Sequence, residues 1–245
     1  MLLRKAGSSY LGIDGCPGGW FCVGLDADAS WSASVIATDA LASVAATATA
    51  ALIDIPIGLP DKDVEERLCD REARSKLGRG RGSSVFPVPA RASLQASDFA
   101  ESLAINRRRT GRGISKQSWL IAPKIRVVDE LMQANSRLRG VLRESHPEVC
   151  FWALNGAKAM RHNKKTAEGR DERMMLLRKF YPMSHIIFEK ATSRYRRSEV
   201  ARDDIVDALV LAVSARLGAG RYESLPVVAP QDAAGLPMEM VFHAP

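Results

Sequence analysis

The sequence predicts an α/β fold in a single domain of 245 residues. Two observations carry this prediction. Roughly the first 60 residues alternate apolar, β-prone runs with turn residues, and an Ala-rich segment among them has the composition of a helix. Near the other end, residues 200–217 are apolar over a length that suits a buried helix. Strands linked through a helix to a further strand are typical of crossover connections, so we expect a sheet covered by helices.

Residues 10–20 predict the first strand and the turn that follows it. Four residues that favour a buried strand lead into Asp14, and glycines and a proline then force the chain to turn. Residues 20–25 are again apolar and β-prone, so the two runs form a hairpin. Asp14 has two interpretations. It is either a turn former, or an ionised carboxylate at the end of a buried strand, which is costly unless a cation such as a metal lies against it.

A second acid follows the fourth predicted strand. Residues 32–37 predict the third strand, and the Ala-rich segment after them predicts a short helix. The apolar run at 51–60 is a strand that must end before its first prolines, because proline cannot donate to a central ladder. Asp54 therefore lies at the carboxyl end of this strand. If the fourth strand returns parallel beside the first, Asp14 and Asp54 are neighbours.

Residues 61–130 predict an insertion of helices and loops over the edge of the sheet. Helices are expected at 63–77, 97–109 and about 125–138, separated by a basic glycine-rich loop, an extended proline-containing run and an arginine cluster. Arg91 and Lys116 lie in the connecting segments, where they are candidates for contacts to phosphate. Their alternative interpretation is that they are merely solvated, as most loop cations are.

The remaining chain predicts a fifth strand at 141–146 and helices at 147–154, 169–180 and 200–217, with a short β-like run at 184–188. Glu144, near the end of the fifth strand, is either an accessory ligand or a surface acid of an edge strand. Lys165, in the polar loop at 157–170, is another candidate for a phosphate contact. From about residue 218 the tail is expected to be irregular.

The last predicted helix carries Asp204 and Asp207 on one face. Asp204 has a structural explanation, since acids in the first turn are favoured by the helix dipole. Asp207 lies one turn later among apolar neighbours, where an unpaired carboxylate costs several kcal/mol. Two acids that project from a core helix toward a sheet edge form half of a divalent-metal site, and Asp14 with Asp54 supply the other half.

The amino-acid composition limits the classes of partner and the cellular setting that the protein can have. The excess of 35 Lys and Arg over 28 Asp and Glu gives a net charge of +7, which suits nucleic acid but is explained equally by solubility. The four cysteines show no pairing typical of zinc sites or disulfides, which favours a reducing, cytoplasmic setting. No signal peptide and no membrane span is expected, and the oligomeric state stays open.

Several motifs together resemble a known family. The pattern Asp-x-x-Asp-Ala-Leu at 204–209 is similar to that of the final helix in the Holliday-junction-resolvase branch of the ribonuclease-H-like superfamily. The whole set more closely resembles the domain-of-unknown-function family 429, described as predicted ribonuclease-H-like nucleases. The motifs are Gly-Ile-Asp-Gly-Cys-Pro-Gly-Gly-Trp at 12–20, Asp-Ile-Pro-Ile-Gly at 54–58, Arg-Gly-Ser-Ser-Val-Phe-Pro-x-Pro-x-Arg ending at 91, Ser-Lys-Gln at 115–117, Glu-Ser-His-Pro-Glu at 144–148 and Lys-Thr at 165–166.

The resemblance covers about residues 9–217. It implies a ribonuclease-H-like sheet of five strands with flanking helices, and a metal site at the matching acids. The predicted catalytic residues are Asp14, Asp54, Glu144, Asp204 and Asp207, of which the four aspartates would bind metal, and Arg91, Lys116 and Lys165 are the predicted phosphate contacts.

These observations favour a divalent-metal-dependent nuclease. Asp14 would bridge two ions, Asp54 and Asp204 or Asp207 would complete their shells, and ligation by oxygen alone suits Mg²⁺ or Mn²⁺. Two alternatives stay open. An ATP-using phosphotransferase of the actin and sugar-kinase type shares the core, although the turn after Asp14 lacks the hydroxyl usual in its phosphate loop. A nucleic-acid-binding protein without turnover would also keep this fold.

Overall fold

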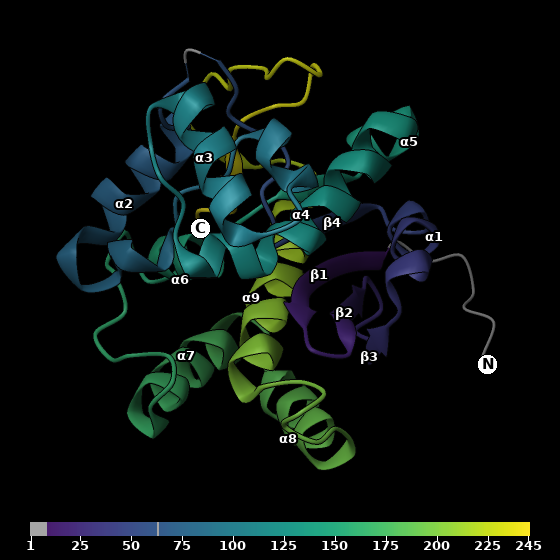
Figure 1. The fold of residues 1–245 in the computed structure, drawn as a ribbon. Coiled ribbons are helices and arrows are strands. Elements are labelled where there is room, and N and C mark those ends of the chain that lie inside the picture. Colours follow the sequence, from purple (N-terminus) through teal and green to yellow (C-terminus); the bar gives the residue numbers. More distant parts are fainter. Residues whose placement is uncertain (1–8, 63) are drawn as a thin grey trace.

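The computed structural model describes residues 9–62 and 64–245, and a mixed five-stranded sheet lies at its centre (Figure 1). Strands β1, β2 and β3 form an antiparallel meander, and β4 and β5 run parallel to β1. With helices on its faces, this is the α/β, ribonuclease-H-like arrangement that the sequence predicts. The strands, in spatial order, are β3 (Trp31–Ile36), β2 (Gly19–Asp26), β1 (Ser9–Cys16), β4 (Ala50–Ile53) and β5 (Leu142–Glu144).

Helices cover both faces of the sheet. One group packs with α9, and α1, α4 and α5 cover the other face. No helix in the described ranges is long and apolar enough to cross a membrane. The helices are α1 (Leu41–Ala46), α2 (Leu68–Arg81), α3 (Phe99–Thr110), α4 (Lys116–Ala134), α5 (Ser136–Arg139), α6 (Pro147–Leu154), α7 (Ala167–Phe180), α8 (Ser184–Arg194) and α9 (Arg202–Gly218).

Alternating side chains divide the strands between the two layers of the core. Leu11 and Ile13 of β1 pack in the layer of α1 and α4, whereas Gly12 between them lies against α9. Because the period along a strand is two residues, Asp14 is on the same face as Gly12. The same alternation through β4 places Asp54 on the α9 side as well.

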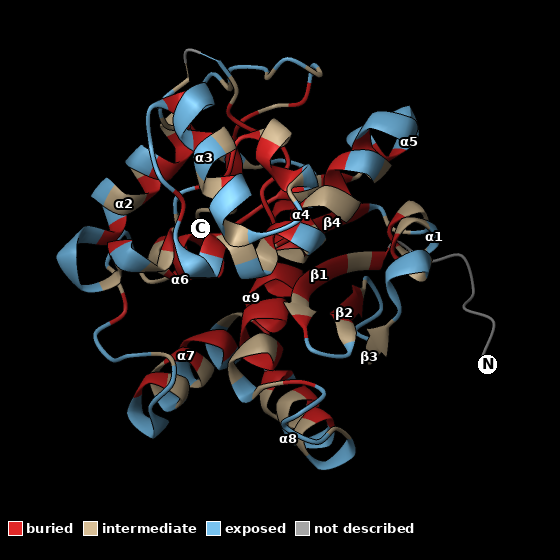
Figure 2. Ribbon diagram, viewed as in Figure 1, coloured by how far each residue is buried: buried red, intermediate tan, exposed pale blue. Residues whose placement is uncertain are grey.

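Helix α9 crosses this face of the sheet, and all its residues from Ile205 to Ala215 are buried, as Figure 2 shows in red. It packs against β1, β2 and β4. The apolar character that the sequence shows on every side of this helix is therefore explained by its position between the sheet and the surrounding helices α6, α7 and α8.

The insertion over the sheet edge contains α2, α3 and most of α4, together with short 3₁₀ turns. The helix predicted from residue 63 begins at Leu68, and residue 63 itself lies outside the described residues. The helix predicted from about residue 125 begins much earlier, at Lys116. The hydroxyl of Ser115 accepts a hydrogen bond from the amide of Ser118 over 3.0 Å and caps this helix. Serine is a preferred N-cap residue, so the sequence contains a signal for this earlier start.

Two segments near the carboxyl end differ from what the sequence predicts. The segment predicted as β-like at 184–188 is helix α8, whose buried residues Ser184, Ile187 and Ala191 recur at spacings of three and four. The tail is irregular over most of its length, as predicted, but it contains a second sheet of two short strands, β6 (Glu223–Leu225) and β7 (Met240–Phe242). The side chain of Ser145 donates to the carbonyl of Val241 over 2.6 Å, so long-range contacts order this tail.

Candidate metal centre

Asp14 and Asp54 are neighbours because β1 and β4 are parallel and in register. Ile13 of β1 pairs with Ile53 of β4, and the amide of Asp54 donates to the carbonyl of Ile13 over 3.0 Å. Each aspartate directly follows one of these paired isoleucines. The crossover that the sequence predicts between the first and fourth strands is therefore confirmed, and it places the two acids at one edge of the sheet.

Helix α9 reaches these acids because Gly12 has no side chain. A Cβ atom at Gly12 would lie 2.1 Å from the carbonyl oxygen of Ala208 and 2.2 Å from the amide nitrogen of Ala212, both on α9. Any larger residue at this position would push the helix away from β1. Since Asp14 lies two residues beyond Gly12 on the same face, the close approach brings Asp207 over it.

The carboxylates of Asp14, Asp54 and Asp207 form an aspartate cluster, in which one oxygen of each lies within 4.8 Å of the others. Burial raises the pKa of Asp14 well above its ordinary value, and repulsion by the carboxylates of Asp54, Asp207 and Asp204 raises it further. Burial and the charge of Asp207 raise the pKa of Asp54 to about 7. Such a group of buried acids favours a bound cation.

Asp204 lies near the aspartate cluster and also has a structural contact. Its Oδ2 accepts a hydrogen bond of 3.0 Å from the amide of Ala201, which satisfies a backbone group at the start of α9. Burial raises the pKa of Asp204 to about 6, and repulsion by Asp203 and Asp207 adds to this effect. The structural explanation of Asp204 is therefore confirmed, whereas the group of potential metal ligands comprises Asp14, Asp54 and Asp207 without it.

Lys164 is the residue of the site that sequence reasoning missed. Its ammonium donates to Oδ2 of Asp207 over 2.5 Å, while the buried Oδ1 of Asp207 has no hydrogen-bond partner in the described chain. The negative charges of Asp207, Asp14 and Asp54 raise the pKa of Lys164 against the opposing effect of its burial. The only sequence signal was its position beside the Lys165-Thr166 motif.

A cavity of about 410 Å³ opens over the aspartate cluster. Asp14, Asp54, Gln117, His146 and Lys164 are among the residues that line it. Burial lowers the pKa of His146, which favours the neutral imidazole. Its Nδ1 accepts from the amide of Glu148 over 3.2 Å, so its proton is on Nε2, which donates to the carbonyl of Ser84 over 3.4 Å.

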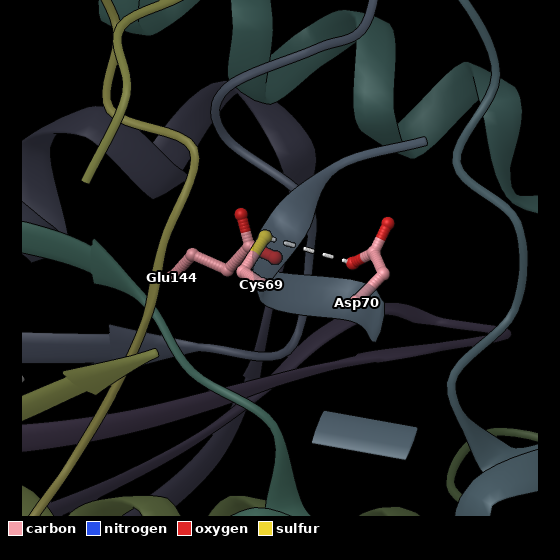
Figure 3. Close-up of side chains that lie close together, drawn as sticks. All are labelled: Cys69, Asp70 and Glu144. Carbon is pink, nitrogen blue, oxygen red and sulfur yellow. Dashed lines mark hydrogen bonds between the residues drawn. The ribbon is translucent and has the colours of Figure 1, made fainter. Parts of the chain in front are cut away.

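Glu144 is not part of the aspartate cluster. It lies with Cys69 and Asp70 in a second group of potential ligands, shown in Figure 3. The buried guanidinium of Arg67 occupies this second group. Its Nη2 donates over 2.6 Å both to Oδ1 of Asp70 and to Oε1 of Glu144, and Nη1 donates over 2.8 Å to Oε2 of Glu144.

The same Oε2 of Glu144 accepts the amide of Ile57 over 2.8 Å, so both carboxylate oxygens are engaged inside the protein. Burial raises the pKa of Glu144 to about 7, although Arg67 counteracts the shift. A metal ion here would have to displace a fully buried arginine. The contacts therefore give Glu144 the role of anchoring Arg67, in place of the predicted accessory ligand.

The three predicted phosphate contacts lie in different environments. Arg91 is engaged inside the protein, because its Nη2 donates to Oδ1 of Asp129 over 2.9 Å and also to Oδ2 of Asp232 in the tail. This correction removes Arg91 from the set of free cations. Lys116 is exposed at the first turn of α4. Lys165 is exposed and lines two pockets that border Lys164.

A family model described as a protein of unknown function, DUF429, matches residues 12–231. This range contains the aspartate cluster, Asp204 and Lys164. No curated protein and no solved structure matches the chain.

Proposed function

This chain belongs to the DUF429 family of unknown function, and from its acidic site we propose that it is a divalent-metal-dependent nuclease that hydrolyses phosphodiester bonds of nucleic acid. The observation that carries the proposal is the aspartate cluster, in which Asp14, Asp54 and Asp207 come from two adjacent parallel strands and a buried helix. Residues so far apart in the sequence gain nothing for stability by being buried together as like charges.

The donor set fits Mg²⁺ or Mn²⁺. All the groups in the aspartate cluster are carboxylate oxygens, and hard divalent cations prefer oxygen ligands. The Oδ1 of Asp207 has no hydrogen-bond partner among the described residues, so it is a buried acceptor that a cation would satisfy. Asp14, Asp54 and Asp207 would hold the metal, and Asp204 lies near enough for its charge to raise the pKa of Asp14. Bound metal would supply an activated water and stabilise the leaving oxygen.

The other residues of the cavity would bind and orient the substrate. Lys164 lines the cavity with its ammonium against Asp207, so a negatively charged phosphodiester in the cavity would have this ammonium as a partner. His146 also lines the cavity, but its Nε2–H is engaged by the carbonyl of Ser84 over 3.4 Å. Removal of the proton from the attacking water falls to the ionised aspartates, because the imidazole has its remaining lone pair in use with the amide of Glu148.

The turn after β1 weighs against the phosphotransferase alternative. A phosphate loop needs free backbone amides that point at the nucleotide. In this hairpin the amide of Gly18 donates to the carbonyl of Glu199 over 3.1 Å, and the side chain of Lys124 covers the carbonyl of Gly19. The turn is therefore engaged in internal contacts and is not arranged as a phosphate loop. The chemistry of the site is that of its aspartates.

The test is a cleavage assay on DNA and RNA, single- and double-stranded, with Mn²⁺, with Mg²⁺ and with a chelator. We expect cleavage only with metal, and its loss in Asp14→Asn and Asp54→Asn. The matched control is Asp28→Asn. Asp28 is an exposed aspartate in the β2–β3 turn, at the opposite end of these strands from Asp14. Failure of every substrate to be cut, while nucleic acid still binds, would favour the non-catalytic alternative.

A further inference from the structure

A second cavity, of about 280 Å³, shares Lys164 with the cavity over the aspartate cluster. Six cationic side chains line it against two acidic ones, Asp203 and Asp207. We call it the basic pocket and define it by these six cations: Lys164, Lys165, Arg170, Arg173, Arg197 and Arg202. Such an excess of one charge around a hollow favours an anionic ligand.

Half of the cations in the basic pocket are free to bind a ligand. Lys164 is paired with Asp207, Arg170 with Asp171, and Arg173 with Glu148. The other three, Lys165, Arg197 and Arg202, are exposed, and no ion pair to them is found within residues 9–62 and 64–245. Their charges therefore face the pocket or the solvent without a carboxylate to neutralise them.

A buried donor and a helix N-terminus also line the basic pocket. Arg173 is completely buried, and its Nε has no hydrogen-bond partner in the described chain. Helix α9 begins here as well, at Arg202, and its N-cap residue is Ala201, whose side chain cannot accept the amides of the first turn. Unsatisfied donors at a helix N-terminus are suited to the oxygens of an anion.

We propose that the basic pocket binds a phosphate group of a nucleic-acid backbone, adjacent to the phosphate that lies at the aspartate cluster. This assignment rests on the proposed function, because it takes the ligand to be the nucleic acid that is cut there. Lys164 is the common wall of the two cavities, so one polynucleotide strand passing it would present successive phosphates to both. The free arginines and the amides of α9 recognise the phosphate oxygens, which every nucleotide has.

The test measures binding of a short fluorescent oligonucleotide to the chelator-treated protein, so that cleavage does not contribute. Arg197→Ala combined with Arg202→Ala removes two exposed cations of the basic pocket. Arg178→Ala combined with Arg221→Ala removes two exposed cations elsewhere and is the charge-matched control. We expect the pocket variant to lose about tenfold in affinity, as for one lost charge-assisted hydrogen bond, and about one unit of salt slope. The control variant should lose far less.

Equal losses in both variants would overturn the assignment, because they would show a diffuse electrostatic effect. Thermal melts with inorganic phosphate separate the possible sources of the ligand. If phosphate stabilises the native protein and not the pocket variant, but the oligonucleotide binds both alike, the pocket takes a free phosphate and the backbone assignment fails. If the pocket variant alone binds poorly while no substrate is ever cut, the pocket holds and the nuclease proposal fails.

Discussion

Lys164 and Asp207 form an ion pair of 2.5 Å in which the carboxylate is almost fully buried and the lysine side chain is about one-third exposed. We expect Lys164→Ala to lower the free energy of unfolding of the metal-free protein by about 1–3 kcal/mol, because it leaves a buried carboxylate among two others without its cation. Mn²⁺ should narrow the difference, since the metal takes over the neutralising role. Thermal melts with and without Mn²⁺ measure both effects.

Lys158→Ala is the control, because Lys158 is an exposed lysine of the same loop region. A Lys164 variant that melts like the native protein without metal would show that the ion pair contributes nothing to the aspartate cluster.

The raised pKa values predict how stability depends on pH. Asp54 has a pKa of about 7 in the fold against an ordinary value of 3.8, so between these values the folded state binds a proton that the unfolded chain has lost. Its contribution to stability is therefore complete below about pH 4 and is lost as the pH rises through 7. We expect Asp54→Asn to flatten this loss and to make the metal-free protein more stable at pH 8.

The measurement is a series of melts from pH 5 to 8 for the native protein and the Asp54 variant. Metal ions require the ionised carboxylates, so the gain in melting temperature from Mn²⁺ should grow over the same range and vanish in the variant. A pH profile identical in the two proteins would mean that Asp54 is ionised normally and is not part of a repelling group.

Close packing at Gly12 predicts a large effect of a single methyl group. Gly12→Ala places a Cβ atom 2.1 Å from the carbonyl of Ala208, and the helix must move to relieve this contact. We expect a loss of about 3 kcal/mol or more in the free energy of unfolding, and a weaker response to Mn²⁺ because Asp207 moves with the helix. Gly140→Ala is the control, since its Cβ would meet only Arg137 at an ordinary 3.7 Å.

The contacts of Arg91 predict that its removal lowers the stability of the fold without weakening nucleic-acid binding. Its removal leaves Asp129 and Asp232, whose side chains are 6% and 1% exposed, without a shared cation. We expect Arg91→Ala to cost about 3 kcal/mol and to leave the salt dependence of nucleic-acid binding unchanged. Arg108→Ala, an exposed arginine of the same insertion, should have little effect on stability. A stable Arg91 variant with a reduced salt slope would restore the phosphate contact predicted from the sequence.

The sequence predicts the frame of the candidate site well, because local signals specify it. The apolar runs that lead into Asp14 and Asp54, and a helix apolar on every side, are enough to place three of the acids. The contacts of Arg67, Arg91 and Lys164 could not be predicted from the sequence. Each of these cations pairs with an acid more than 35 residues away, at a distance that no periodicity or capping pattern encodes.

The strand predicted at 184–188 was wrong, and the two short strands of the tail were not predicted, for a related reason. Three adjacent apolar residues fit a short strand as well as one helical turn. Only the packing of this segment against α7, α9 and β3 decides between the two structures. The tail strands β6 and β7 are three residues long and are ordered by contacts such as the pair of Arg143 with Glu239 over 2.6 Å. Pairs between residues so far apart in the sequence form only when the chain has folded, so no local pattern predicts them.

The position of Lys164 between the two cavities has a thermodynamic consequence. A metal ion that draws Asp207 away from Lys164 releases that ammonium for a phosphate, and a phosphate that draws Lys164 away releases Asp207 for the metal. By linkage, each ligand must then increase the affinity for the other by the same factor. Titration of Mn²⁺ with and without phosphate, and of phosphate with and without Mn²⁺, should give equal ratios in the native protein and ratios near one in Lys164→Ala. Cooperative recruitment of metal and nucleic acid would then depend on a single side chain that serves two ligands in turn.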